Sequence, residues 1–263
     1  MKTFFTILLG IACLTVLVWG HSNWNKKIAV ASNRTSTSSS IDGDNSQEIT
    51  TNSSQEDLLA YTSNWPPAAV ETFKKAIKEK KTYKILFFGS PAIGSDTSGS
   101  YPKVKEKLLE TFGNKNIKVG LKTFNTTSTK FISMNNQEEI AAEKADLIVL
   151  EPFILLNNGE VLPDNTLTDI TKMMNDIKAK NPDTTFILQP SYPLYQAKIY
   201  PSQVAVLKKF AEENKIAYLD HWTAWPNSNT EAFKEYLLPD GSAPSEKGYQ
   251  VWSNYLIKYF TNQ

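Results

Sequence analysis

The chain has almost no arginine, cysteine or histidine. The only arginine is Arg34, the only cysteine is Cys13, and the two histidines are His21 and His221. The region after residue 57 therefore has no disulfide and no cysteine-based metal site. The lack of arginine there excludes a bidentate guanidinium clamp on a phosphate or carboxylate. The lack of histidine leaves His221 as the one histidine that can act as a general base in that region.

The chain also has no excess of charge of either sign, because the formal net charge of its 263 residues is only +1. Proteins that bind nucleic acid usually carry an excess of positive charge, and this chain does not, so we expect no nucleic-acid partner. The sequence contains no glycine-rich nucleotide fingerprint, and its carboxylates do not follow metal-ligand spacing. We therefore expect no cofactor and no metal ion.

One long apolar run is present, from Phe4 to Gly20. Its length of about 17 residues is at the short end for a bilayer span. We predict that residues 1–24 form an N-terminal membrane anchor, which would make this a single-pass protein of the cell membrane. Two alternatives remain open. The run can be a cleaved signal peptide, with residues 29–31 (Ala-Val-Ala) as the cleavage site and a secreted product, or Cys13 can be lipidated.

Residues 25–57 are rich in serine, threonine and asparagine and poor in apolar side chains. Such a segment cannot bury enough surface to fold, so it is predicted to be a flexible linker. A linker between an anchor and a domain indicates that the domain, residues 58–263, lies on the extracytoplasmic side.

From residue 58 onward, short apolar runs alternate with amphipathic helical patterns. The predicted strands are 84–88, 118–124, 147–150, 185–188 and 217–219. The predicted helices are 66–80, 103–112, 137–144, 166–180, 201–214, 230–237 and 245–260. Strands that are apolar throughout and separated by helices are typical of a parallel sheet covered on both faces. We therefore predict an α/β fold with three layers, α/β/α, around a flavodoxin-like sheet of five strands.

Ligands of such sheets bind beyond the carboxyl ends of the strands. The candidate site residues are polar and aromatic residues that follow these strands, together with Asp240 before the last predicted helix. They are Ser90, Asn125, Glu151, Asn157, Tyr192, His221, Trp222 and Asp240.

This layout resembles the SGNH/GDSL hydrolases over most of residues 83–260. The matching features are the Gly89-Ser90 turn after the first strand, the Asn157-Asn158 pair, and Asp240, Pro244 and Gly248 before the last helix. The resemblance implies a three-layer domain that cleaves esters with a serine nucleophile, a histidine base and an aspartate that orients the base. It also implies an oxyanion hole, in which Asn157 would occupy the asparagine position.

The sequence departs from the family pattern at the reacting positions. Pro91 stands where the family has its nucleophilic serine, and Ala243 stands where it has its histidine. Asn158 replaces an aspartate, and residues 125–128 offer no glycine for the second motif. Neither proline nor alanine can perform acid–base or nucleophilic work, so the family's standard mechanism is not available.

Each candidate residue therefore has two interpretations. Ser90 is either a shifted nucleophile or a capping serine before Pro91. His221 is either a substitute base, oriented by Asp220 or Asp240, or a packed histidine. Glu151 either bonds to loop backbone or contacts a ligand. The same choice, between ligand contact and loop structure, applies to Asn125, Tyr192, Trp222 and Asp240.

Two functions follow from these interpretations. In the first, the protein is an extracytoplasmic SGNH-like protein with a lost or rearranged catalytic site that binds a cell-envelope glycan or a related component. In the second, it is an active esterase or acyltransferase that acts on the O-acyl groups of an envelope polysaccharide through Ser90, His221 and Asp240.

Overall fold

The computed structural model describes residues 56–263. The predicted anchor, residues 1–24, and all but the last two residues of the predicted linker, 25–57, lie outside this range. Residues 56–60 are helical and lead into the domain. Within the described range no helix combines the length and the apolar character that a membrane span requires.

A five-stranded parallel sheet forms the centre of the domain. Its strands are β1 (Tyr83–Gly89), β2 (Ile117–Thr123), β3 (Leu147–Leu150), β4 (Thr185–Leu188) and β5 (Ala217–Tyr218). Every pair of neighbours is parallel, and the strand order is β2-β1-β3-β4-β5. The predicted flavodoxin-like sheet is thus confirmed. In this order the chain reverses its direction of winding between β1 and β3, which is where such folds bind ligands.

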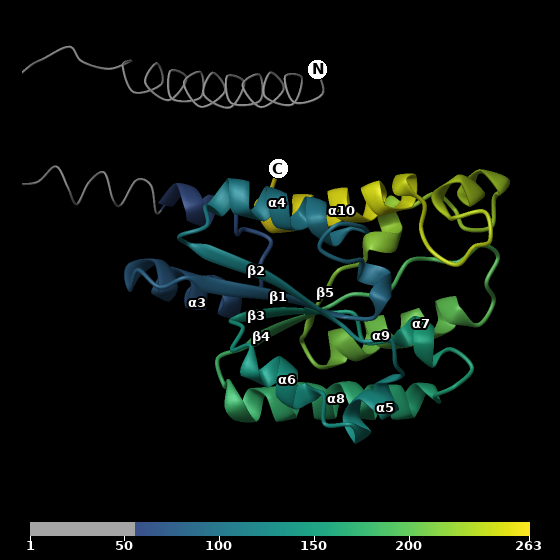
Figure 1. The fold of residues 1–263 in the computed structure, drawn as a ribbon, viewed down its shortest axis with the longest axis horizontal. Coiled ribbons are helices and arrows are strands. Elements are labelled where there is room, and N and C mark those ends of the chain that lie inside the picture. Colours follow the sequence, from purple (N-terminus) through teal and green to yellow (C-terminus); the bar gives the residue numbers. More distant parts are fainter. Residues whose placement is uncertain (1–55) are drawn as a thin grey trace, which may run out of the picture. The chain divides into compact units, whose positions relative to one another are not determined.

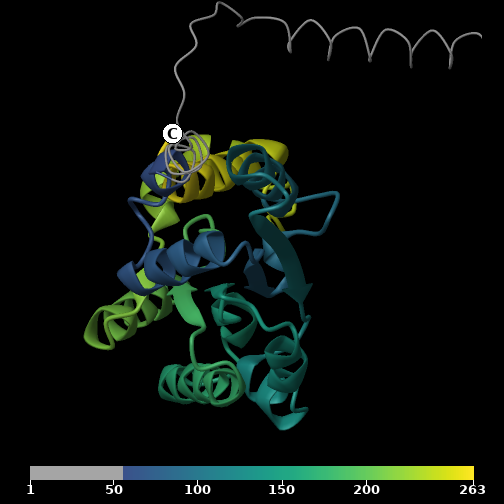
Figure 2. The same cartoon turned by 90° about the vertical axis from the view of Figure 1, so that its left-hand side faces the viewer.

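Helices cover both faces of the sheet and make three layers (Figures 1 and 2). One face packs against α3 (Pro67–Lys78), α4 (Tyr101–Phe112) and α10 (Glu246–Thr261). The other face packs against α5 (Ser128–Ser133), α6 (Gln137–Ala142), α7 (Ile154–Asn157), α8 (Pro163–Lys180) and α9 (Tyr200–Glu213). Side chains alternate along β1, so that Phe87 enters the first core and Phe88 the second.

Several short elements were not predicted. They are α5, α7 and the 3₁₀ turns η1 (Pro91–Ile93) and η2 (His221–Ala224), and they contain six residues or fewer. Two helical turns or less cannot display a helical periodicity in the sequence. The helix predicted over residues 230–237 is instead a 3₁₀ segment, η3 (Glu231–Tyr236).

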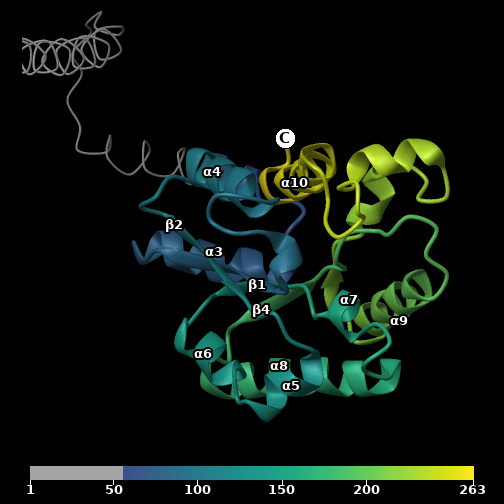
Figure 3. The ribbon, with the colours of Figure 1, turned by 45° about the vertical axis from the view of Figure 1, so that its right-hand side comes forward.

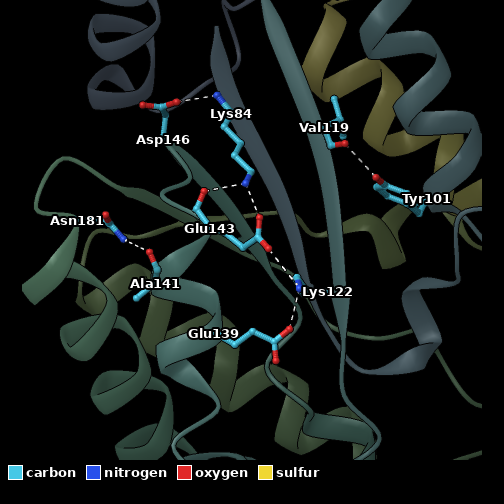
Figure 4. Close-up of polar contacts among 9 residues, drawn as sticks. All are labelled: Lys84, Tyr101, Val119, Lys122, Glu139, Ala141, Glu143, Asp146 and Asn181. Atoms are coloured by element: carbon cyan, nitrogen blue, oxygen red, sulfur yellow. Dashed lines mark hydrogen bonds and ion pairs between the residues drawn. The ribbon is translucent and has the colours of Figure 1, made fainter.

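An ion-pair network fixes α6 and the residues after it against the edge of the sheet (Figure 4). Lys84 of β1 donates to the backbone oxygen of Glu143 at 2.7 Å and pairs with its carboxylate. Lys122 of β2 lies 2.7 Å from Glu139 and 3.2 Å from Glu143. The hydrogen bond from Lys84 is the main cause that lowers the pKa of Glu143. These contacts connect the two first strands to the helix that precedes β3.

Candidate functional site

The candidate site lies at the carboxyl edge of the sheet, where Ser90 follows β1 and Glu151 follows β3. The short helix α7, which follows β3 in the chain, is labelled in Figure 3. Both side chains are buried, with 2% and 0% of their surface exposed. The Ser90 N–H donates to Glu151 Oε2 at 2.8 Å. A Cβ atom on Gly89 would lie 2.4 Å from the Glu151 backbone oxygen, so the closeness of these two strand ends requires glycine at this position.

Burial raises the pKa of the Glu151 carboxyl, and hydrogen bonds from Ser90 and the Phe153 backbone oppose the rise. The second oxygen of the carboxyl, Oε1, has no hydrogen-bond partner among residues 56–263. Of the two interpretations of Glu151, the structure displays the bond to loop backbone. The carboxyl accepts the backbone N–H of Ser90, so this N–H has a partner inside the protein.

Ser90 has the geometry of a capping residue. Its Oγ accepts a hydrogen bond from the Ala92 N–H at 3.3 Å and caps η1, whose first residue is Pro91. Proline suits this first position because its fixed φ is helical and it has no N–H to satisfy. Pro91 has neither a hydroxyl nor an N–H, and it occupies the position where the resemblance predicts the nucleophile.

His221 is fully buried at the start of η2, and both of its ring nitrogens are occupied. Nε2 lies 3.0 Å from the Pro190 carbonyl oxygen, and Nδ1 accepts from Trp225 Nε1 at 3.1 Å. Both contacts require the neutral tautomer with the proton on Nε2, because a carbonyl can only accept and an indole N–H can only donate. The imidazole also stacks on Trp252, with ring centroids 4.5 Å apart.

Burial lowers the pKa of His221 to about 4, and the Pro190 carbonyl and Asp220 oppose this only in part. A base needs a free nitrogen, and this imidazole has none. Among residues 56–263 no hydrogen bond joins it to Ser90 or to Asp240. The geometry of His221 is that of a packed histidine, and its catalytic role stays a prediction.

Asn157 is buried at the end of α7, and its amide group is used up inside the protein. Oδ1 accepts from the Ser128 N–H at 2.9 Å. Nδ2 donates to Ser128 Oγ at 2.8 Å and to Thr166 Oγ1 at 2.9 Å. An oxyanion donor needs a free N–H, and both amide hydrogens are engaged here. The predicted oxyanion residue thus joins α5, α7 and α8.

Tyr192 connects the end of β4 to the last loop. Its hydroxyl donates to the Ser242 carbonyl oxygen at 2.6 Å. Burial raises the pKa of Tyr192 to about 12, and Tyr249, Glu151 and Asp240 contribute in that order. The Tyr192 hydroxyl therefore joins the segment after β4 to the loop that contains Asp240 and Ser242. Tyr249 was not predicted as a site residue.

Trp222 is bonded to the segment that follows β4. Its Nε1 donates to the Ser191 carbonyl oxygen at 2.7 Å, and its ring lies 5.5 Å from the ring of Tyr200. Gln189 and Ser191 were not chosen as site residues, although both are buried polar residues near this loop, and the aromatic residue Tyr200 is buried as well. Gln189 was the detectable signal, since an amide directly after an apolar strand needs a partner, and Trp252 Nε1 supplies one at 3.1 Å.

Asp240 and Asn125 are both exposed. Asp240 Oδ1 accepts from the N–H and the Oγ of Ser242, at 3.0 and 2.7 Å, which closes a local turn. Asp240 also lines an open hollow of about 540 Å³. The residues that line the hollow are Leu194, Tyr195, Lys234, Leu237, Leu238, Pro239, Asp240 and Gly241.

Solved structures of esterases share this fold. A protein described as a GDSL-like lipase from Parabacteroides merdae superposes with a TM-score of 0.58 at 18% identity, over 70% of this chain and 98% of that one. An acetylxylan esterase from Geobacillus stearothermophilus gives 0.54 at 17% identity, over 69% and 96%. A lipase/acylhydrolase from Enterococcus faecalis gives 0.54 at 15% identity, also over 69% and 96%.

No protein-family model matches the sequence, and no curated protein matches it. The likeness is therefore one of architecture, and it agrees with the strand order and the placement of the candidate residues at the carboxyl edge. Residues 56–263 have the fold of the SGNH/GDSL hydrolases.

Proposed function

We propose that this protein is an SGNH-type domain that no longer hydrolyses esters and instead binds a component of the cell envelope, most simply a glycan. One observation carries the proposal: each group that ester cleavage would need is either replaced or bonded inside the protein. The replaced positions are Pro91 and Ala243. The bonded groups are the Ser90 N–H, the His221 ring and the Asn157 amide.

The loss of these groups has a large expected effect on rate. A serine hydroxyl is a weak nucleophile until a base accepts its proton, and among residues 56–263 no hydrogen bond joins Ser90 to a histidine or lysine side chain. The loss of a single oxyanion donor slows ester cleavage by about 10²–10³-fold. Proline at position 91 removes the nucleophile and its backbone donor together.

The hollow beside Asp240 supports the binding part of the proposal. A sugar presents both hydroxyl groups and apolar C–H faces, so it suits a lining with a carboxylate, an aromatic ring and aliphatic side chains. Asp240, Tyr195 and Leu238 supply these three kinds of group. Leu238 is 42% exposed, which leaves an apolar contact open to a ligand.

The apolar run of residues 4–20 and the polar linker of residues 25–57 support an envelope location. An anchored or secreted domain with this fold would meet polysaccharide rather than cytoplasmic esters. Membrane anchoring by residues 1–24 is part of the proposal.

Hydrolysis of p-nitrophenyl acetate by the purified protein tests the loss of catalysis. We expect a rate equal to that of buffer. Robust turnover that disappears in Ser90→Ala would overturn the proposal.

Binding of envelope polysaccharide, measured by titration calorimetry, tests the second part. We expect Asp240→Asn to weaken binding and Asp164→Asn, an exposed carboxylate on α8, to leave it unchanged. If the unchanged protein and Asp240→Asn bind the polysaccharide with equal affinity, the hollow beside Asp240 is not the binding site.

The active esterase is the second candidate, favoured by the structural likeness to an acetylxylan esterase. It would require His221 to leave both of its hydrogen bonds and approach Ser90 with Asp240 as orienting carboxylate. The same hydrolysis assay separates the two candidates.

A further inference from the structure

Helix α10 has a second face that packs only partly against the core. Trp252, Leu256 and Phe260 enter the core. Five other side chains of the helix line a groove of about 610 Å³, together with three residues from other segments. The complete lining is Asn64, Thr223, Ala224, Val251, Asn254, Tyr255, Lys258 and Tyr259.

The walls of this α10 groove are fixed by hydrogen bonds. On one side Asn64 Nδ2 donates to the Tyr259 backbone oxygen at 3.3 Å, and the neighbouring Trp65 Nε1 donates to the Phe260 oxygen at 3.0 Å. Figure 2 shows the segment before α3 beside the end of α10. On the other side Thr223 Oγ1 donates to the Asp220 oxygen at 2.7 Å. Because its walls are already fixed, the groove loses little conformational entropy when it binds a ligand.

Two tyrosine rings form the aromatic part of the groove. Tyr255 packs edge-on against His221, with centroids 6.3 Å apart, and Tyr259 packs edge-on against Phe260 at 5.1 Å. Both tyrosines are partly exposed. Rings that are held from behind offer an apolar surface at little further entropic cost.

The polar part of the groove has a defined charge. Asn64, Asn254 and Thr223 supply neutral groups that can donate and accept, and Lys258 supplies a positive charge. Within the described part of the chain, residues 56–263, no carboxylate lines the groove. The ion pairs of α10 within residues 56–263 are made by Glu246 and Lys247 in its first turn, and Lys258 in its last turn is in none of them.

We propose that the α10 groove binds a glycan segment that carries an anionic group, either a carboxylate or a phosphate. The tyrosine faces would contact the C–H surface of a sugar or polyol, the amides would bond to its hydroxyls, and Lys258 would pair with the anion. This site goes beyond the proposed function, because it shares no residue with the hollow beside Asp240 or with the buried residues at the carboxyl edge.

Titration calorimetry on the full chain in detergent tests the site with three probes. They are a galacturonic acid hexamer, a glycerol phosphate oligomer and neutral maltohexaose. We expect one or both anionic probes to bind, and the probe that binds identifies the anion as carboxylate or phosphate. Lys258→Gln and Tyr255→Ala should each weaken this binding by about tenfold. The matched control is Lys209→Gln, which removes an exposed lysine of α9 that does not line the groove.

Three results would overturn the site. They are the absence of binding of both anionic probes at millimolar concentration, equal weakening in Lys209→Gln and Lys258→Gln, and equal affinity for maltohexaose. Asp240→Asn should leave the affinity of the α10 groove unchanged. The groove and the hollow beside Asp240 can therefore succeed or fail independently.

Discussion

The backbone N–H of Ser90 donates a hydrogen bond to Glu151 Oε2 at 2.8 Å, across the boundary between β1 and β3. This boundary is the place where a flavodoxin-like sheet receives its ligand. In this protein a buried carboxyl of its own chain receives the N–H instead. The contact joins the ends of β1 and β3, which are 61 residues apart in the sequence.

Glu151→Gln should reduce the pH dependence of stability. Burial raises the pKa of Glu151 in the folded state, so between its unfolded and its folded pKa the folded protein holds a proton that the unfolded chain has lost. Stability from this group is thus complete at low pH and is lost as the pH rises through the folded pKa. The slope in that window is about 1.4 kcal/mol per pH unit. Glutamine resembles the neutral carboxyl and does not titrate, so the slope of stability against pH should be smaller in Glu151→Gln.

Urea unfolding of the protein and of Glu151→Gln between pH 4 and pH 8 measures this difference. Glu160→Gln changes an exposed carboxylate just after α7 and should retain the original slope. Parallel curves for the protein and Glu151→Gln would mean that the carboxyl does not titrate in the folded state as its burial requires.

The fold was predictable because the strands are continuous apolar runs and the long helices have one apolar face. The predicted 147–150 and 185–188 coincide with β3 and β4, and the predicted 118–124 differs from β2 by one residue at each end. The strands of a parallel sheet that is buried on both faces are continuous apolar runs, which can be recognised directly in the sequence. The departures at Pro91 and Ala243 were equally visible, since they are single positions in a pattern.

The internal bonds of the candidate site were not predictable, because they join residues that are distant in sequence. Asn157 bonds to Ser128, 29 residues earlier, and His221 bonds to Pro190, 31 residues earlier. Sequence supplies the residue types at the carboxyl edge, but the partner of each polar group depends on how neighbouring loops pack. The same side chain can serve a ligand or a loop, and only the contact distances distinguish the two.

His221 should remain neutral and hold one tautomer well below the usual pKa of histidine. Burial lowers its pKa to about 4, so between about 4 and the ordinary 6.5 the unfolded chain binds a proton that the folded protein does not. Stability from this group is therefore present above 6.5 and is lost as the pH falls through 4, by about 3 kcal/mol in total.

Nitrogen-15 NMR on a His21→Gln variant, in which His221 is the remaining histidine, measures both properties. We expect the signals of the tautomer protonated at Nε2, unchanged from pH 8 to pH 5. A midpoint near 6.5 would contradict the two hydrogen bonds and return His221 to the list of candidate bases.

Restoring the reacting residues should not restore ester hydrolysis. Pro91→Ser with Ala243→His supplies a hydroxyl and an imidazole at the positions that the resemblance indicates. The Ser90 N–H would still be bonded to Glu151, and both amide hydrogens of Asn157 would still be engaged. The backbone N–H that Pro91→Ser restores would then be the one free oxyanion donor, and each missing donor costs about 10²–10³-fold in rate, so we expect p-nitrophenyl acetate turnover within about tenfold of each single variant. A larger gain would show that the pocket retains its donors and would favour a recent loss of catalysis.

Asn157→Ala should destabilise the domain far more than the same change at the next residue. The substitution removes three hydrogen bonds and leaves the Ser128 N–H buried without its acceptor. Each unsatisfied buried group costs about 1–3 kcal/mol, so we expect a loss of about 2–4 kcal/mol in the free energy of unfolding. Asn158→Ala changes an exposed side chain and should cost less than about 0.5 kcal/mol.

Chemical denaturation of the two variants gives the comparison directly, because both lose the same amide group from adjacent positions. A similar small loss in both would mean that the Asn157 side chain is free in solution. It would then be available as an oxyanion donor, as the resemblance predicts. A large loss confined to Asn157→Ala would establish the residue as the joint between α5, α7 and α8, because a catalytic amide exposed to substrate has no comparable role in stability.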